Sequence, residues 1–241
     1  MTSQMAQLSY DTKPVDYFQC TRPEMLPFVP VNCGRLLDVG CAEGAFGETL
    51  KRARGVEVWG VEPIQSIAAI AMTKLDRVIE GTFGPDTNLP SHTFDSIVFN
   101  DVLEHMIDPE SALRYARELL TPEGVVVASI PNIRSFPTFW RLMIHASWEY
   151  VDCGVLDKTH LRFFTKPSII NMFERQGYVL EKVCGINAYL GVPNIPTNLW
   201  RAFRVMNALF MGKFDDMKFQ QFAVVARPAA DLPRGLRKGG D

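Results

Sequence analysis

The sequence predicts a Rossmann-like α/β fold: a seven-stranded, mostly parallel sheet with helices on both faces and an antiparallel last strand. Three observations predict it. Short β-branched runs alternate with helix-period segments between residues 35 and 131, the first run ends in a glycine-rich turn, and two later runs bracket an insertion. Crossovers between parallel strands are right-handed, so the carboxyl ends of the strands meet at one edge, where ligands bind.

Seven segments have the length and the composition of strands. They are Arg35 to Gly40, Val56 to Glu62, Arg77 to Gly81, Phe94 to Asn100, Val125 to Ile130, Tyr178 to Val183 and Phe219 to Ala226. The first five are separated by helix-period segments, which is the pattern of a doubly wound sheet. A further helix is predicted between Thr165, a candidate N-cap followed by Pro167 in the first turn, and Gly177 just past its end.

The length of the chain predicts one domain. A chain of 241 residues fits a single elaborated core, because cores stop growing at roughly 250–300 residues. We expect this domain over residues 1–227, with a lid segment at about 133–164 and an insertion at about 187–217. Residues 228–241 are rich in Pro, Gly and charge and are expected to form a flexible tail.

Charge and cysteine content argue against several classes of function. The formal net charge is -2 without a basic block in the body of the chain, so no nucleic-acid partner is expected. Five cysteines without a C-x-x-C spacing indicate neither a disulfide framework nor a zinc knuckle, and a cytoplasmic location fits this usage best. Neither a secretory signal nor a transmembrane segment is predicted.

The strongest motif is the run from Leu36 to Gly47, a buried strand that passes through a glycine turn into a helix. Gly40 allows a sharp turn, and Gly44 allows backbone N–H groups to approach a ligand. The alternative is an ordinary strand-to-helix turn of an α/β protein. A dinucleotide fingerprint would place glycine at residues 40, 42 and 45, but Ala42 and Ala45 occupy two of these positions, which disfavours NAD.

A second signal is an acidic residue at the end of the next strand. Glu62 lies 22 residues after Gly40, where its carboxylate could accept both hydroxyls of a ribose. The alternative is that Glu62 is solvated or caps the helix that starts at Pro63. Because Glu62 accompanies the glycine turn, we favour a site for an adenosine cofactor.

The two motifs together resemble those of class I methyltransferases, which use S-adenosylmethionine. By this resemblance Asp38, Gly40, Ala42 and Gly44 surround the methionine part of the cofactor and Glu62 holds the ribose. The resemblance extends the expected cofactor set to Cys41, Phe46, Pro63, Gly81, Thr82, Asn100, Asp101 and Val102. Two departures, Ala42 for a glycine and Thr82 for an aspartate, imply a slightly altered adenine pocket.

A third signal runs from Phe94 to His105 and resembles the fourth strand of that family with the turn after it. Asp101, Glu104 and His105 are spaced i, i+3 and i+4, so a helical turn would place them on one face. His105 could act as a general base, or the three side chains could bind a divalent cation. The layout resembles that of ubiquinone-pathway O-methyltransferases. The alternative is that Glu104 and His105 only fix the start of a helix.

The lid segment carries several aromatic residues, which suggest a wall for the acceptor or ordinary core packing; Trp140 is the candidate substrate contact. The run from Asp157 to Thr165 resembles a segment of sugar and quinone-precursor methyltransferases. By this resemblance His160 is a second candidate base, and Arg162 could hold a carboxylate or phosphate of the acceptor. The alternative is an exposed hairpin edge.

Apolar residues at helical spacing fill much of residues 187–214. We expect a helix that closes over the sheet or joins two subunits as a homodimer. A further alternative is a peripheral contact with a membrane surface, with Arg201, Arg204 and Lys213 at the headgroups.

The motifs together predict an S-adenosylmethionine-dependent methyltransferase that methylates a hydroxyl of a sugar-like or phenolic small molecule. A divalent cation remains open as a second cofactor. The alternative from another class is a non-catalytic protein that keeps the cofactor-binding fold, and a third hypothesis is an NAD-dependent oxidoreductase.

Overall fold

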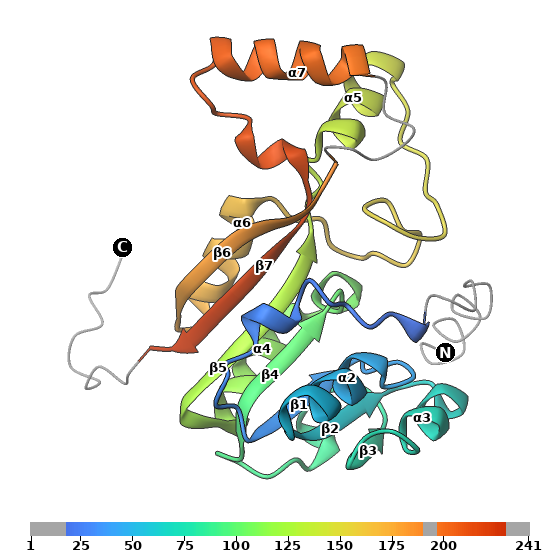
Figure 1. Ribbon diagram of the computed structural model, residues 1–241, viewed down its shortest axis with the longest axis vertical. Coiled ribbons are helices and arrows are strands. Elements are labelled where there is room, and N and C mark those ends of the chain that lie inside the picture. Colours follow the sequence, from blue (N-terminus) through green and yellow to red (C-terminus); the bar gives the residue numbers. More distant parts are fainter. Residues whose placement is uncertain (1–17, 190–196, 230–241) are drawn as a thin grey trace.

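The computed structural model describes residues 18–189 and 197–229 (Figure 1). It contains one seven-stranded sheet in the order β3-β2-β1-β4-β5-β7-β6. The strands are β1 Arg35–Val39, β2 Glu57–Glu62, β3 Arg77–Glu80, β4 Phe94–Asn100, β5 Leu120–Pro131, β6 Tyr178–Ala188 and β7 Phe219–Pro228. All seven predicted strands are present, and β5 and β6 are longer than the sequence suggested.

The direction of pairing agrees with the predicted fold class. Strands β1 to β5 pair in parallel, whereas β7 runs antiparallel to both β5 and β6. In the central register Asp38 lies beside Gly60 of β2 and Val98 of β4. The order of the strands reverses at β1 and β4, and such a switch point is where open α/β sheets bind ligands.

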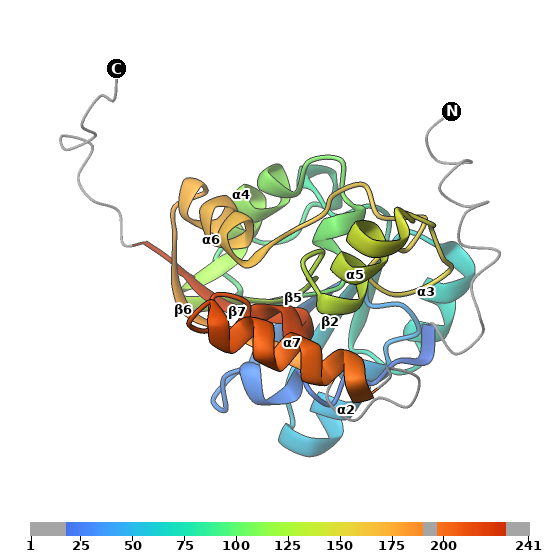
Figure 2. The same cartoon turned by 90° about the horizontal axis from the view of Figure 1, so that it is seen from above.

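Helices cover both faces of the sheet, as Figures 1 and 2 show. Helices α2 and α3 contact β2, and α4 and α6 contact β5 and β6 respectively. The bounds of the helices are α2 Ala45–Arg54, α3 Gln65–Ala71, α4 Pro109–Leu119, α5 Phe136–His145, α6 Lys166–Arg175 and α7 Thr197–Leu209. Short 3-10 turns occur at η2 Leu26–Phe28, η3 Pro85–Thr87, η4 Leu103–His105 and η5 Asp215–Lys218.

Two apolar cores lie on the two faces of the sheet. Leu36 and Val98 belong to the core with α2, whereas Leu37 and Ile97 belong to the core with α4. Neighbouring residues of one strand point to opposite faces, so each central strand must be apolar throughout. This explains why the strand segments read as continuous apolar runs.

Helix α6 begins and ends where its sequence signals predict. The Thr165 hydroxyl accepts a hydrogen bond from the Ser168 backbone N–H at 3.4 Å, and the Ser168 hydroxyl accepts one from the Thr165 N–H at 2.9 Å. Gly177 adopts a left-handed φ of 75° just past the helix. These contacts form a capping box that satisfies N–H groups left open at the helix start.

Helices α5 and α7 form a layer beyond the carboxyl ends of the strands (Figure 1). Phe136 of α5 packs 4.7 Å from Phe203 and 5.6 Å from Trp200 of α7, measured between ring centroids. Helix α7 therefore packs on α5 in a separate cluster and does not cover a face of the sheet, which corrects one expectation for the insertion. Residues 190–196 of that insertion and 230–241 of the predicted tail lie outside the described residues.

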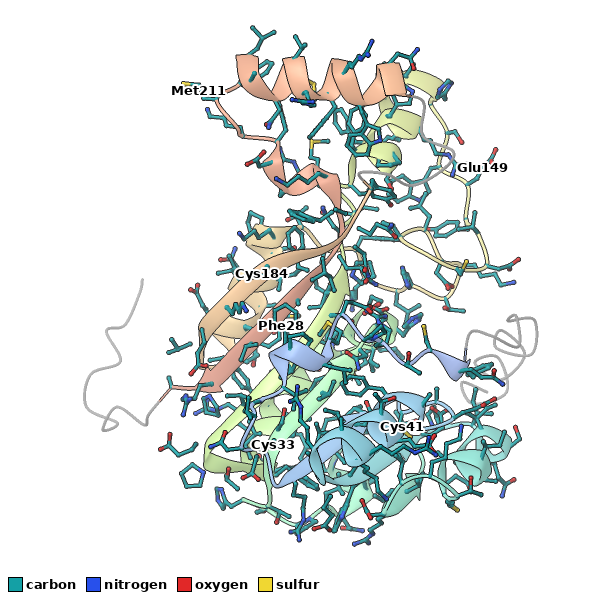
Figure 3. All side chains as sticks on the ribbon, in the orientation of Figure 1. Phe28, Cys33, Cys41, Glu149, Cys184 and Met211 are labelled. Carbon is teal, nitrogen blue, oxygen red and sulfur yellow. The ribbon has the colours of Figure 1, made fainter. Side chains whose placement is uncertain are left out.

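The α5–α7 layer also exposes apolar side chains. Met143 and Ile144 at the end of α5 are 60% and 59% exposed, and Leu209 and Met211 at the end of α7 are 76% and 85% exposed. Figure 3 shows Met211 at the end of the molecule away from the amino ends of the parallel strands. The described part of the chain has no helix with the length and apolar character that a bilayer crossing requires. The homodimer and the membrane-surface contact stay predictions.

Candidate functional site

The turn after β1 has the backbone conformation that its glycines predict. Gly40 and Gly44 have left-handed φ angles of 66° and 79°, and Ala42 between them has a φ of 49°. A Cβ at Gly40 would lie 2.8 Å from a methyl group of Val102, so glycine is required there by space as well as by conformation. The turn is thereby held against the segment that follows β4.

Glu62 connects this turn to the start of α3. One carboxylate oxygen accepts the Ala42 N–H at 3.0 Å, and the other accepts the Ile64 N–H at 3.0 Å. Burial raises the pKa of Glu62, and these two donors oppose that rise. Glu62 therefore fixes the backbone before α3, and each carboxylate oxygen keeps a further lone pair that a ligand could use.

Asp38 is a buried acidic residue just before the turn. It is only 2% exposed at the end of β1. Burial, together with the negative charge of Glu62, raises the pKa of Asp38 to about 7. Two carboxylates in such a position favour a ligand that carries positive charge.

The other residues predicted near the cofactor divide into two groups. The side chains of Cys41 and Phe46, 5% and 3% exposed, belong to the apolar core beside α2, so only their backbone faces the turn. Pro63 and Thr82 are exposed, and the Gly81 N–H donates to the backbone oxygen of Glu62 at 3.0 Å. The ends of β2 and β3 therefore meet beside Glu62.

Asn100 ends β4 with an unpaired amide. Its side-chain oxygen and nitrogen are both buried, and neither has a hydrogen-bond partner among the described residues. Buried amides are normally satisfied, so this one is available to a ligand. Asn100 is the one predicted cofactor residue whose side chain has this feature.

Asp101 adopts a left-handed φ of 55° and turns toward β5 and β7. Its carboxylate accepts hydrogen bonds from Ser129 and Gln221, both at 2.9 Å, and an ion-paired hydrogen bond from Arg22. Arg22 also donates to Ser129 at 3.1 Å and pairs with Glu24 at 2.8 Å. Sequence reasoning missed Arg22, because nothing in the local sequence links it to a residue 79 positions away.

The expected helical face of Asp101, Glu104 and His105 is not formed. Only Leu103–His105 forms a 3-10 turn, and Asp101 lies outside it with its carboxylate held by Arg22. Glu104 and His105 instead lie close to His160, which comes from the loop before α6. The candidate ligand atoms of Glu104, His105 and His160 all lie within 4.8 Å of one another.

The two histidines are oriented by backbone carbonyl groups. Nδ1 of His105 lies 3.1 Å from the Thr159 oxygen, and Nδ1 of His160 lies 3.1 Å from the Val155 oxygen. A carbonyl oxygen only accepts, so each Nδ1 carries the proton in the neutral ring. Burial, with the charge of His160, lowers the pKa of His105 to about 4, so this ring is neutral near pH 7.

Glu104 is the acid of this cluster and is fully buried. Oε1 of Glu104 lies 3.9 Å from Nε2 of His160, beyond hydrogen-bond distance. Burial, followed by the charge of Asp101, raises the pKa of Glu104 well above its usual value. The backbone oxygen of Glu104 accepts the N–H groups of Leu161 and Arg162, which fixes this loop to η4.

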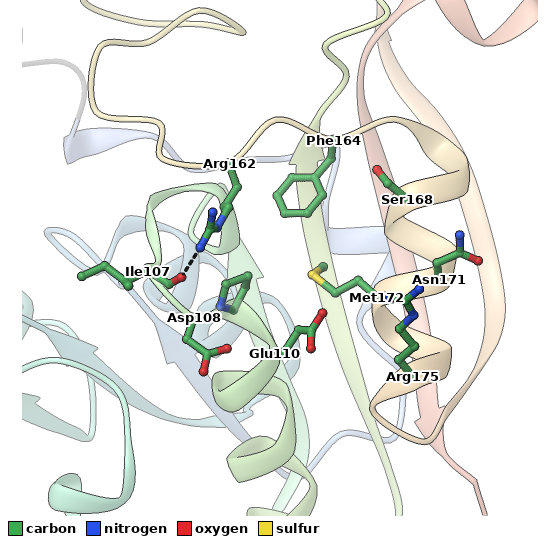
Figure 4. A pocket seen from close by; sticks show the side chains of 10 residues that line it. Ile107, Asp108, Glu110, Arg162, Phe164, Ser168, Asn171, Met172 and Arg175 are labelled. Carbon is green, nitrogen blue, oxygen red and sulfur yellow. Dashed lines mark hydrogen bonds between the residues drawn. The ribbon is translucent and has the colours of Figure 1, made fainter. Parts of the chain in front are cut away.

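The side chains of the two predicted acceptor contacts, Trp140 and Arg162, point to other partners than this cluster. Trp140 packs 6.0 Å from Phe136 in the α5–α7 layer. Arg162 donates to the backbone oxygen of Ile107 at 2.7 Å and lines a pocket of about 580 Å³ between α4 and α6 (Figure 4). Glu110 and Arg175 also line this pocket, and none of the predicted cofactor residues does.

Comparison with known proteins places the chain in a family. A family model described as a methyltransferase domain matches residues 18–183. A ubiquinone biosynthesis O-methyltransferase of Yersinia enterocolitica is 34% identical over 142 residues, which cover 56% of this chain and 57% of that protein. One from Cereibacter sphaeroides is 27% identical over 150 residues, 59% of each chain. The matched region thus spans a little over half of these relatives.

Solved structures share the whole fold. A putative methyltransferase of Haloferax volcanii, solved with the Trm112 activator, is 16% identical with a TM-score of 0.64, covering 94% of this chain and 96% of its own. A SAM-dependent methyltransferase of Archaeoglobus fulgidus is 19% identical with a TM-score of 0.60, covering 93% of both chains. At these identities the likeness shows the fold alone. From the matched family model, the chain belongs to the family of methyltransferase domains, and its cofactor is S-adenosylmethionine.

Proposed function

We propose that this chain transfers the methyl group of S-adenosylmethionine to a hydroxyl oxygen of a small molecule, sugar-like or phenolic. One observation carries the proposal. Val102 packs against Gly40 of the turn between β1 and α2, residues 40–44, which we call the cofactor turn. The backbone oxygen of Val102 accepts the N–H of His105 at 3.0 Å. The cofactor turn is therefore adjacent to the cluster of Glu104, His105 and His160. Methyl transfer to a hydroxyl that loses its proton requires such an arrangement.

Several features of the turn fit this cofactor. Gly40 and Gly44 give the turn its left-handed conformation, and Asn100 offers an unpaired amide. Glu62 keeps lone pairs for ribose hydroxyls, and Asp38 places an acid near the positive charges of the methionine part. We expect Cys41 and its neighbours to contact the cofactor through their backbone groups.

Methyl transfer mainly requires that the protein align the acceptor with the methyl group. The bound cofactor supplies an activated sulfonium methyl group, so the chain's residues mainly orient the acceptor and exclude water. A hydroxyl acceptor would have to give up its proton to a group of this chain or to water during the transfer. His105 and His160 are the candidates for handling that proton, a contribution of ~10²–10⁴ in rate.

Two further contacts are proposed for the acceptor. Arg162 would hold a carboxylate or phosphate group of the acceptor, since a guanidinium pairs with such groups in a bidentate manner. Trp140 would supply an aromatic wall for the acceptor. The names of the relatives, ubiquinone biosynthesis O-methyltransferases, support an oxygen acceptor for this chain.

The test is an acceptor screen that follows formation of S-adenosylhomocysteine, with catechols, sugars and amines as separate classes. We expect turnover with hydroxyl acceptors, and His105→Ala and His160→Ala should reduce turnover more than cofactor affinity. Cofactor binding without turnover across the panel would instead support a non-catalytic protein. Calorimetric affinity for NAD in place of S-adenosylmethionine would reject the proposal outright.

A further inference from the structure

The pocket of about 580 Å³ between α4 and α6 is separate from the cofactor turn, since none of the residues expected at the cofactor lines it (Figure 4). The start of α4 forms one wall. One face of α6 forms the other, with lining residues at the i, i+3, i+4 and i+7 positions Ser168, Asn171, Met172 and Arg175. The volume lies within the range of about 300–1,000 Å³ that is usual for small-molecule sites.

The floor of this pocket is apolar. Phe164 and Met172 line it and are only 8% and 6% exposed, and Pro109 at the start of α4 is also buried. An aromatic ring and a thioether pack well against flat apolar groups and against other rings. The floor therefore favours a ligand that carries an apolar or aromatic side group.

Four charged side chains surround the floor, two of each sign. They are Arg162, Arg175, Asp108 and Glu110. Among the described residues no two of these four form an ion pair with each other, and Asp108 lies 3.8 Å from Arg114 instead. Arg175 has neither a hydrogen bond nor an ion pair to any described side chain. Opposite charges thus face one pocket without neutralising one another directly.

This arrangement of charge selects for a ligand that carries both signs. A ligand with a single charge would be attracted by two of the four groups and repelled by the other two. Figure 4 shows the carboxylate of Glu110 pointing toward α6, the helix that carries Arg175. A guanidinium donates two parallel hydrogen bonds to a carboxylate, and a carboxylate accepts hydrogen bonds from an ammonium group.

We propose that the pocket between α4 and α6 binds a free α-amino acid with an apolar or aromatic side chain. The carboxylate of the amino acid pairs with Arg175, and its ammonium group donates to Glu110. Its side chain packs on Phe164 and Met172. The site needs neither the cofactor nor the methyl acceptor, so it does not depend on the proposed function.

The test is an NMR titration of the full chain with L-phenylalanine. Saturating S-adenosylhomocysteine is present throughout, so that the cofactor turn cannot take up the amino acid. We expect saturable shifts of backbone amide signals in α6, including those of Asn171 and Arg175. Phenethylamine, which lacks the carboxylate, and hydrocinnamate, which lacks the ammonium group, should each bind ~10-fold or more weakly, because each loses a charge-assisted contact.

Variants of the two charged contacts give a second measurement. Glu110→Gln and Arg175→Gln should each weaken binding of L-phenylalanine by ~10-fold or more. Glutamine at position 110 still accepts the side-chain N–H of Gln176, which now donates to Glu110 at 3.0 Å, so the fold should be kept. Thermal melting checks this.

Glu174→Gln and Arg52→Gln are the matched controls and should leave the affinity unchanged. Glu174 belongs to α6 but does not line the pocket, and the Arg52 side chain on α2 is 78% exposed. Absence of saturable shifts in the wild-type chain would overturn the proposal, as would equal affinity for the three compounds. Undiminished binding by both pocket variants, or equal loss in the controls, would overturn it as well.

Discussion

The guanidinium of Arg22 donates to the carboxylate of Asp101, so the segment before β1 is tied to the end of β4. Arg22 reaches Ser129 of β5 and Gln221 of β7 with the same guanidinium, at 3.1 Å each. The side chain of Arg22 is 12% exposed and that of Asp101 is 24% exposed. One arginine therefore joins the residue after β4 to β5 and β7.

Arg22→Gln should lower the free energy of unfolding by about 1–3 kcal/mol, because it leaves a largely buried carboxylate without its charged donor. Denaturant titration measures this change. Arg52→Gln is the matched control: Arg52 pairs with Glu48 within α2, but its side chain is 78% exposed, so we expect a change below about 0.5 kcal/mol. Equal effects of the two variants would contradict a structural role for Arg22.

Gly40→Ala should weaken cofactor binding by ~10-fold or more and destabilise the chain, because the new methyl group meets Val102 at 2.8 Å in a left-handed conformation. Gly55→Ala is the control, since Gly55 has a similar φ of 69° with nothing within 4 Å of its Cβ position. Gly55→Ala should cost only ~1 kcal/mol of stability and leave affinity for S-adenosylmethionine intact. Calorimetry and thermal melting of both variants check this.

Asp38 should make the stability of the cofactor-free chain fall as the pH rises. Its pKa is about 7 in the folded chain, above its usual value of 3.8, so the folded state binds the extra proton between these values. The contribution of this group to the free energy of unfolding is therefore fully present below about pH 4. It decreases between about pH 4 and about pH 7 and is constant above that. Asp38→Asn should remove this slope from unfolding curves measured between pH 5 and 8.

The same carboxyl should couple cofactor binding to proton release. A positively charged ligand favours the ionised form of Asp38, so affinity for S-adenosylmethionine should rise from pH 6 to pH 7.5. Calorimetry in two buffers of different ionisation enthalpy measures the released proton. No buffer dependence in the wild-type chain, or the same dependence in Asp38→Asn, would contradict this assignment.

Glu62→Gln should reduce affinity for S-adenosylmethionine by ~10-fold or more. The amide group of glutamine would face a backbone N–H of Ala42 or Ile64, where the carboxylate now accepts, and it would lose an acceptor for the ribose. Glu80→Gln is the control, because Glu80 lies beside Glu62 in the register of β3 but is exposed. An unchanged dissociation constant for Glu62→Gln would remove Glu62 from the cofactor site.

Local pattern was sufficient for the strands, the glycine turn and the limits of α6. Buried parallel strands are apolar throughout, and Gly40 and Thr165 act through backbone conformations and hydrogen bonds within a few residues. The family and its cofactor followed from three such motifs in order, and the matched family model confirms both. Glu62 could be placed because strand ends of a parallel sheet share one edge.

The sequence by itself determined the fold class and the position of the glycine turn after β1, since these depend on periodicity and on short-range contacts. Only the tertiary structure decided the surroundings of Asp101 and Glu104. The sequence spacing suggested that they share a face, but Asp101 turns to Arg22, 79 residues away, and Glu104 meets His160 instead. Such pairings depend on how separate loops pack on the sheet edge, and no local pattern encodes that packing.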